Sequence, residues 1–113
     1  MSDARRPLQV ELDLSPEKVV EAARRLLGLI TFYSIESREC RAWLVPEGTA
    51  AREAAGEIHT DMMRGFVKAE VVPADALTSA GSMANARERG LARLEGKDYV
   101  VRDGDVLTFR FTA

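Results

Sequence analysis

Hydrophobic residues recur along this chain with two periods, one typical of strands and the other of helices. The strand-like stretches are short, rich in β-branched and aromatic residues, and in places alternate strictly between apolar and polar positions. They predict strands at residues 8–14, 29–35, 40–45, 66–72, 98–101 and 106–111. The polar residues 36–39 predict a hairpin, and the strongly apolar last strand is typical of the centre of a sheet.

Apolar residues at helical spacing predict two longer helices. Ser15 is a good N-cap and Pro16 suits the first helical position, so the first helix is expected to run from there to Gly28. The second is expected from Thr49 to about Met63. Its apolar members fall within a ~100° arc, which we expect to face a sheet; they are Ala51, Ala54, Ala55, Ile58 and Met62. Two short helices are predicted at 74–80 and 83–89.

The order hairpin, helix, strand, irregular stretch and final strand predicts an α+β domain, with one main helix packed on a mixed sheet. A β-grasp, or ubiquitin-like, arrangement fits this order, with the last strand inserted beside the first. We divide the chain into an N-terminal extension with a candidate strand (1–14), a leading helix (15–28) and the β-grasp domain (29–113). The candidate strand is expected to bury its aliphatic residues against the domain or against a second copy, so monomer and homodimer both remain open.

Length and composition exclude several classes of protein. The 113 residues make one domain, with 46% hydrophobic and 30% charged residues. No apolar run reaches the ~18 residues that a membrane-spanning helix needs, so no membrane association is expected. One cysteine and one histidine provide neither a disulfide framework nor a His/Cys metal site. The formal net charge of −2 is not typical of a strong nucleic-acid binder, so any phosphate contact is expected from a local patch.

Two stretches of the sequence are similar to a known family. The strings AAGEIHTDMMRGFVKAEV and EGKDYVVRDGD resemble the C-terminal domain of YchF-type, Obg-like P-loop nucleotidases. The resemblance covers about residues 16–113. It implies a TGS-type β-grasp module, related to those of threonyl-tRNA synthetases and SpoT/RelA-type enzymes. It also implies contact with RNA, the ribosome or other protein elements, and a cytoplasmic location.

Nucleotide hydrolysis is not implied for this chain. In the family that activity belongs to a G domain with a phosphate-binding loop, and no G-x-x-x-x-G-K-[ST] motif occurs among the 113 residues. We therefore expect a non-enzymatic binding module that needs no cofactor. The leading hypothesis is contact with RNA or the translation machinery, weak and salt-sensitive because the domain is not basic overall. The alternative is a protein–protein interaction or regulatory module.

Five cations are the candidates for contact with RNA or a partner: Arg41, Arg87, Arg89, Arg93 and Lys97. Whether they converge on one exposed face is the feature that discriminates the RNA hypothesis from its alternative. Trp43 shares a strand face with Arg41 and is expected in the core. If it were exposed, it would offer a stacking or docking platform.

No residue is assigned a catalytic or metal-binding role. His59 and Asp61 are two positions apart, so their side chains diverge on a continuous helix; we expect a half-buried histidine and no catalytic pair. Cys40 has no base nearby that would activate its thiol. The Asp-Gly-Asp sequence at 103–105 predicts a tight turn and is far short of a calcium-binding loop.

Overall fold

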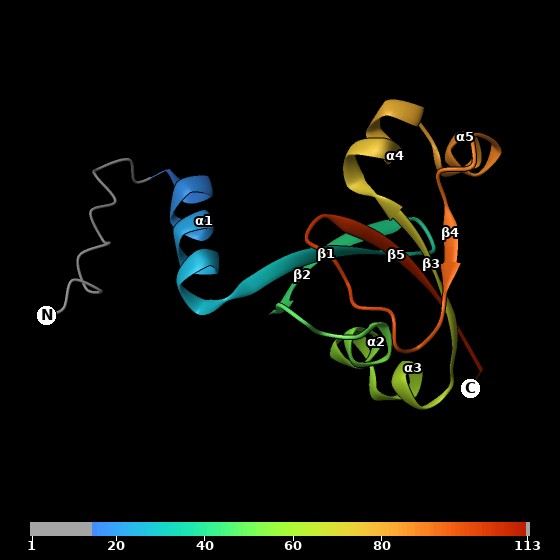
Figure 1. Ribbon diagram of the computed structural model, residues 1–113, viewed down its shortest axis with the longest axis horizontal. Helices are drawn as coiled ribbons and strands as arrows, with labels where there is room; N and C mark the ends of the chain where they lie inside the picture. The colour runs from blue at the N-terminus through green and yellow to red at the C-terminus, as the bar shows by residue number, and fades with distance from the viewer. Residues whose placement is uncertain (1–14, 113) are drawn as a thin grey trace, which may run out of the picture.

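The computed structural model of the chain describes residues 15–112 and has a five-stranded mixed sheet with helices on both faces (Figure 1). The strand predicted in the extension 1–14 lies outside these residues and stays a prediction. Across the sheet the order is β2 (Glu39–Pro46), β1 (Leu29–Glu36), β5 (Asp105–Phe111), β3 (Phe66–Pro73) and β4 (Arg93–Glu95).

The last strand occupies the centre of the sheet. β5 runs parallel to β1 on one side and antiparallel to β3 on the other. The hairpin of β1 and β2 closes through a two-residue turn in which Ser37 has a φ of 56°. The predicted α+β class, the hairpin and the central position of the last strand are therefore confirmed.

The main core lies between one face of the sheet, called the front face, and the helices α2 (Ala51–Ile58) and α3 (Thr60–Arg64). Helix α2 contributes three fully buried alanines to it, so its backbone lies close to the strands, as the small-residue stripe predicts, and α3 contributes Met62. The sheet contributes large side chains, among them Phe32, Val45, Val71 and Leu107.

A smaller core lies on the opposite, back face. Here α4 (Ala74–Ala80) and α5 (Met83–Glu88) pack against Val72 near the end of β3, with Leu91 and Ala92 from the segment that leads to β4. Both short helices match their predicted positions. They cover the back face around β3 and are separate from the helices of the front face (Figure 1).

The single helix predicted from Thr49 to Met63 is wrong. The helix ends at Ile58, His59 takes an extended conformation (φ −162°, ψ 138°), and α3 begins at Thr60. The break is stabilised because the His59 Nδ1 accepts a hydrogen bond from the Asp61 backbone N–H and so caps α3. The apolar stripe gave no sign of this break because Met62 on α3 still turns into the same core.

The strand predicted at 98–101 is also wrong. That segment makes only an isolated bridge, between Val100 and Ala50, and holds the entrance to α2 through the Ala51 N–H donated to the Tyr99 carbonyl. The edge strand is instead β4, which pairs with β3. At three residues β4 is too short for alternation to be read from the sequence.

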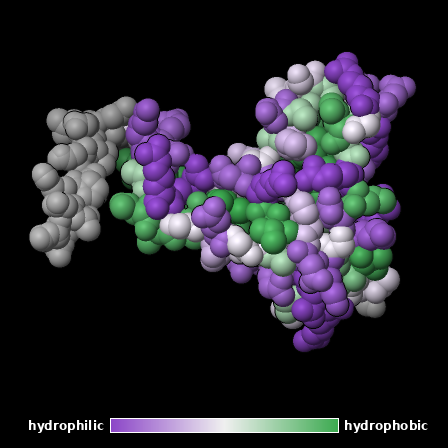
Figure 2. Space-filling model, viewed as in Figure 1, coloured by the Kyte–Doolittle hydropathy of each residue, from purple (hydrophilic) through white to green (hydrophobic). Residues whose placement is uncertain are grey.

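The leading helix α1 (Pro16–Leu27) is confirmed, with Ser15 as its N-cap and Gly28 as a left-handed C-cap. None of its residues is buried. Figure 2 shows apolar side chains gathered on α1 and continuing toward the hairpin; Val19, Val20, Leu26 and Leu27 are the exposed ones on the helix. Arg24 ties α1 to the domain through an ion pair of 2.7 Å with Asp103.

Gly65 lies directly against the backbone of Thr112. A Cβ added there would overlap the carbonyl oxygen of Thr112, and the Thr112 N–H donates to the Gly65 carbonyl at 2.9 Å. We expect Gly65→Ala to lower the free energy of unfolding by about 2–3 kcal/mol, as overpacking against backbone does. Urea denaturation measures the change.

The matched control is Gly96→Ala, because a Cβ at Gly96 meets nothing within 4 Å. Its effect is expected to stay within about 0.5 kcal/mol. Equal stabilities for the two variants would contradict the close approach of Gly65 to the end of β5.

Candidate functional site

Two cations stand opposite each other on the back face of the sheet. Lys68 of β3 is the direct cross-strand partner of Arg110 on β5, and both are exposed. Like charges in this arrangement are destabilising, so packing alone gives no reason for the pair. Neither side chain forms an ion pair within residues 15–112.

Arg87, on helix α5, is a third cation on this back face, where α5 packs against β3. Its guanidinium donates two hydrogen bonds to the Glu70 carboxylate, at 2.8 and 2.9 Å. The Glu70 side chain is only 8% exposed, whereas that of Arg87 is 53% exposed. The hydrogen bonds from Arg87 hold the pKa of Glu70 below its ordinary value against the effect of burial, and the charges of Arg87 and Arg110 act in the same direction.

We call Lys68, Arg87 and Arg110 the basic patch. Both oxygens of Glu70 are used by Arg87, so this one carboxylate leaves two positive charges of the patch uncompensated. Oriented arginine and lysine side chains on an exposed sheet face are suited to bind phosphate groups. The patch is therefore a local concentration of positive charge on a chain of net charge −2.

The five predicted contact residues do not converge on one face. Arg41 lies on β2 and Arg93 on β4, the two edges of the sheet, which are four strand spacings or roughly 19 Å apart. Arg93 is engaged with Glu95 at 2.9 Å and with the Tyr99 hydroxyl at 2.6 Å. Within residues 15–112, Arg89 after α5 and Lys97 after β4 are exposed and make no side-chain ion pair.

Sequence reasoning found one member of the basic patch, Arg87, and missed the other two. Lys68 and Arg110 each lie within a predicted strand, and the strand pattern gives neither of them a role in binding. The signal that could have found them is their register: pairing the two strands antiparallel places one cation opposite the other. The register of β3 against β5 is set by the connections between the strands in the folded domain, and it cannot be read from the hydrophobic pattern of either strand alone.

The Asp-Gly-Asp turn is structural, as predicted. Asp105 is 3% exposed and accepts hydrogen bonds from the Tyr99 hydroxyl at 2.6 Å and the Arg102 N–H at 2.9 Å. Burial, together with the neighbouring Asp105, raises the pKa of Tyr99 to about 12. The other acid of the turn, Asp103, accepts from the Thr31 N–H at 2.8 Å.

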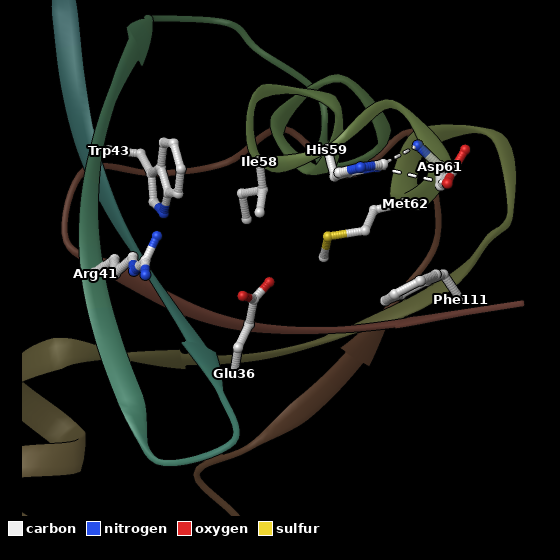
Figure 3. Close-up of a pocket in the computed structure, with 8 residues that line it drawn as sticks. All are labelled: Glu36, Arg41, Trp43, Ile58, His59, Asp61, Met62 and Phe111. Carbon is white, nitrogen blue, oxygen red and sulfur yellow. Dashed lines mark hydrogen bonds and ion pairs between the residues drawn. The ribbon is translucent and has the colours of Figure 1, made fainter. Parts of the chain in front are cut away.

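A groove of about 420 Å³ opens on the front face, between the hairpin and the break between α2 and α3 (Figure 3). Its apolar lining comes from Trp43, Ile58, Met62 and Phe111, and its polar lining from Glu36, Arg41, His59 and Asp61. Trp43 is half-buried and stacks on Phe32 with ring centroids 6.5 Å apart. Trp43 packs against the main core but is not enclosed by it, so the expectation of a core tryptophan holds in part.

His59 and Asp61 lie close together, against the expectation that they diverge. The helix break places the His59 Nδ1 3.7 Å from the Asp61 Oδ2, and the same nitrogen accepts the Asp61 backbone N–H at 3.0 Å. Both side chains are more than 60% exposed, so the histidine is not half-buried. Because the His59 Nδ1 caps α3, the closeness of His59 and Asp61 is explained by local structure, and no catalytic role for the histidine as a base has to be invoked.

The described part of the chain holds no cluster of metal-ligating side chains and no membrane-spanning helix. Within residues 15–112, no three His, Cys, Asp or Glu side chains gather where they could hold a metal ion. No helix there is long and apolar enough to cross a membrane.

Comparison with known proteins gives consistent matches. Residues 29–112 match the family model YchF-GTPase_C, described as "Protein of unknown function (DUF933)". The chain is 48% identical over 95 residues to the Ribosome-binding ATPase YchF of Bacillus subtilis, covering 84% of this chain and 26% of that protein. It is 42% identical over 94 residues to the protein of that name in Escherichia coli O157:H7, covering 83% of the chain and 26% of the relative.

Solved structures agree with the sequence matches. The YchF GTPase of Schizosaccharomyces pombe superposes with a TM-score of 0.75 at 31% identity, over 82% of this chain and 25% of that one. A GTP binding protein from Pyrococcus horikoshii superposes with a TM-score of 0.57 at 22% identity, over 85% of this chain and 24% of its own, and shows the fold alone. The chain therefore spans about a quarter of the length of these relatives.

The buried ion pair under the basic patch gives a pH-dependent prediction. Because the pKa of Glu70 is lowered in the folded state, the pair stabilises the domain above the unfolded pKa of about 4.3, and this contribution is lost as the pH falls through the lower, folded pKa. We expect Glu70→Gln to lower the free energy of unfolding by about 1–2 kcal/mol at pH 7. The difference from the unchanged protein should shrink below pH ~4.

Urea denaturation from pH 7 to pH 3 measures both effects. Glu39→Gln is the matched control, since Glu39 is 67% exposed and its pair with Arg41 is at the surface. A stability difference for Glu70→Gln that stays constant over this pH range would contradict the role of the ion pair.

Proposed function

This chain belongs to the YchF C-terminal domain family, and from that premise we propose that it is a non-enzymatic binding module that contacts ribosomal RNA through the basic patch. The relatives are called ribosome-binding proteins, and a cytoplasmic location goes with that partner. Their ATPase and GTPase names describe proteins about four times as long as the matched region. We do not extend those activities to this chain.

The observation that carries the proposal is the cross-strand pair of Lys68 and Arg110. The repulsion between two cations placed directly opposite each other destabilises the fold. A phosphate bound between them would offset this repulsion, because it attracts both side chains. Arg87 adds a half-exposed guanidinium whose position is held by Glu70, so it can meet a phosphate with little loss of side-chain freedom.

The remaining predicted contact residues have different roles in this proposal. Arg89, just after α5, has an exposed side chain and adds a weaker phosphate contact. Lys97 is also exposed, but its carbonyl accepts the Arg52 N–H of α2, so it lies by the front-face helices and takes no part in this contact. Arg93 serves the structure of the β4 edge, since Glu95 and Tyr99 engage its guanidinium. Arg41 belongs to the groove on the other face.

Protein–protein interaction is a second candidate function. The specific observation in its favour is the groove on the front face, which combines apolar walls with a charged rim. Because the basic patch and the groove lie on opposite faces of the sheet, one module can use both.

The RNA proposal predicts a salt-dependent loss of ribosome binding in a charge-reversal variant. We expect Lys68→Glu with Arg110→Glu to weaken cosedimentation with purified ribosomes at least tenfold at low salt. The slope of log affinity against log salt should fall by about 1.4, which corresponds to two lost phosphate contacts on single-stranded RNA. The measurement is a binding isotherm at several salt concentrations.

The matched control is a double reversal at Lys18 and Arg25 on α1, which changes the net charge by the same amount away from the patch. If the two double variants bind equally, the effect is one of overall charge and the basic patch is not the contact. Binding that is insensitive to salt would count against RNA as the ligand.

Nucleotides provide a further test. Because the chain has no phosphate-binding loop and no hydroxyl placed to hold Mg²⁺ beside one, we expect neither hydrolysis nor tight binding of ATP or GTP. Isothermal titration calorimetry with each Mg²⁺–nucleotide is the measurement, and micromolar affinity for either would contradict the prediction.

A further inference from the structure

Glu36 at the end of β1 is a carboxylate without a cationic partner among residues 15–112. It is exposed, lies on the front face, and its carboxylate points into the groove, toward the space between Ile58 and Met62 (Figure 3). The nearest basic residue of the lining, Arg41, is engaged with Glu39 at 2.9 Å and does not neutralise it. An uncompensated negative charge therefore faces a largely apolar space.

The walls of that space are aromatic and aliphatic. The Trp43 indole N–H donates to the Ser34 hydroxyl at 2.9 Å, so the ring is fixed and presents its apolar surface to the groove. Phe111, 43% exposed, forms the opposite wall from the end of β5. Ile58 and Met62 line the helix side, where the break at His59 separates α2 from α3.

The rim of the groove is negative. Asp61 lies at the far side from Glu36, and its cationic neighbour Arg64 is at the long distance of 3.9 Å. Since Arg41 is matched by Glu39, the charge that remains toward the opening is acidic. Such a rim attracts a cation and repels the phosphates of a nucleic acid.

From these features we propose that the groove binds a lysine or arginine side chain presented by a protein partner. The aliphatic stem packs against Ile58 and Met62, and the charged head meets Glu36 beside the face of Trp43. Long cationic side chains bury their methylene stems while keeping the head charged, and aromatic rings attract such heads. This assignment does not rest on the RNA proposal, which concerns the opposite face.

The partner is a basic protein segment because only that chemistry uses every wall of the groove. A purely apolar side chain would leave Glu36 facing hydrocarbon, which is unfavourable for a carboxylate. An acidic segment would add a like charge beside Glu36 and Asp61. RNA would bring its phosphates to the same acidic rim.

Trp43 makes the proposal directly measurable because it is the single tryptophan of the chain. The probes are three capped heptapeptides, each with a central residue between alanines: lysine, its uncharged aliphatic analogue norleucine, and glutamate. We expect the lysine peptide to change Trp43 fluorescence with a Kd of about 0.1–1 mM, and norleucine to bind about fivefold more weakly. The glutamate peptide should not bind, and calorimetry on the same samples measures binding independently of fluorescence.

Glu36→Gln keeps the shape of the side chain and removes its charge, so we expect it to reduce the preference for lysine over norleucine about fivefold. The matched control is Glu88→Gln on α5, an exposed acid on the other face. Thermal unfolding verifies that both variants are folded, and the Lys68→Glu, Arg110→Glu variant should bind the lysine peptide as the unchanged protein does.

Three results would overturn the proposal. The first is equal affinity for the lysine and norleucine peptides, which would make the groove simply apolar. The second is the absence of saturable binding of the lysine peptide up to about 5 mM by both methods. The third is a Trp43 response to oligouridine that Glu36→Gln strengthens, which would assign the groove to RNA.

Discussion

The position of β5 between β1 and β3 is the constraint on which the rest of the structure depends. The strand enters through Gly104, whose N–H donates to the Thr31 carbonyl on β1 and whose carbonyl accepts the Ala74 N–H at the start of α4. Gly104 adopts a φ of 87°, in the left-handed region that favours glycine. This turn thereby sets the register of β5 against both neighbours, and the buried Asp105 with its hydrogen bonds to Tyr99 and Arg102 fixes the turn from inside.

Both candidate surfaces follow from that one strand. Consecutive residues of a strand point to opposite faces, so Arg110 projects from the back face beside Lys68, while Phe111 lines the groove on the front face. A shift of β5 by one residue would exchange these two positions. It would place an arginine in the groove and a phenylalanine among the cations, so the basic patch and the groove require the same register.

Some charged residues of the domain hold the fold, others are left free to bind, and Arg87 does both. Arg87 and Glu70, and Arg93 with Tyr99, are hydrogen-bonded across elements and stabilise the packing of α5 and the β4 edge. Lys68, Arg110 and Glu36 have no such partner within residues 15–112. Of these unpaired charges, the positive ones, Lys68 and Arg110, lie on the back face, and the negative one, Glu36, lies on the front face. The back face therefore favours phosphates and the front face favours cationic side chains.

The sequence by itself determined the elements with strong local signals: the capped leading helix, the hairpin, the alanine stripe that faces the sheet and the apolar final strand. Its family resemblance supplied the module type. The break at His59 combines a side-chain cap with the packing of Met62 in the core, and β4 is a strand through its pairing with β3. Lys68 meets Arg110 across two strands that are 42 positions apart in the chain, and Glu36 meets Phe111 from a strand at the other end of the domain, while Trp43 comes from the same hairpin as Glu36. Only the tertiary structure decided these sites, because strand register and sheet order bring together side chains whose spacing along the sequence carries no period.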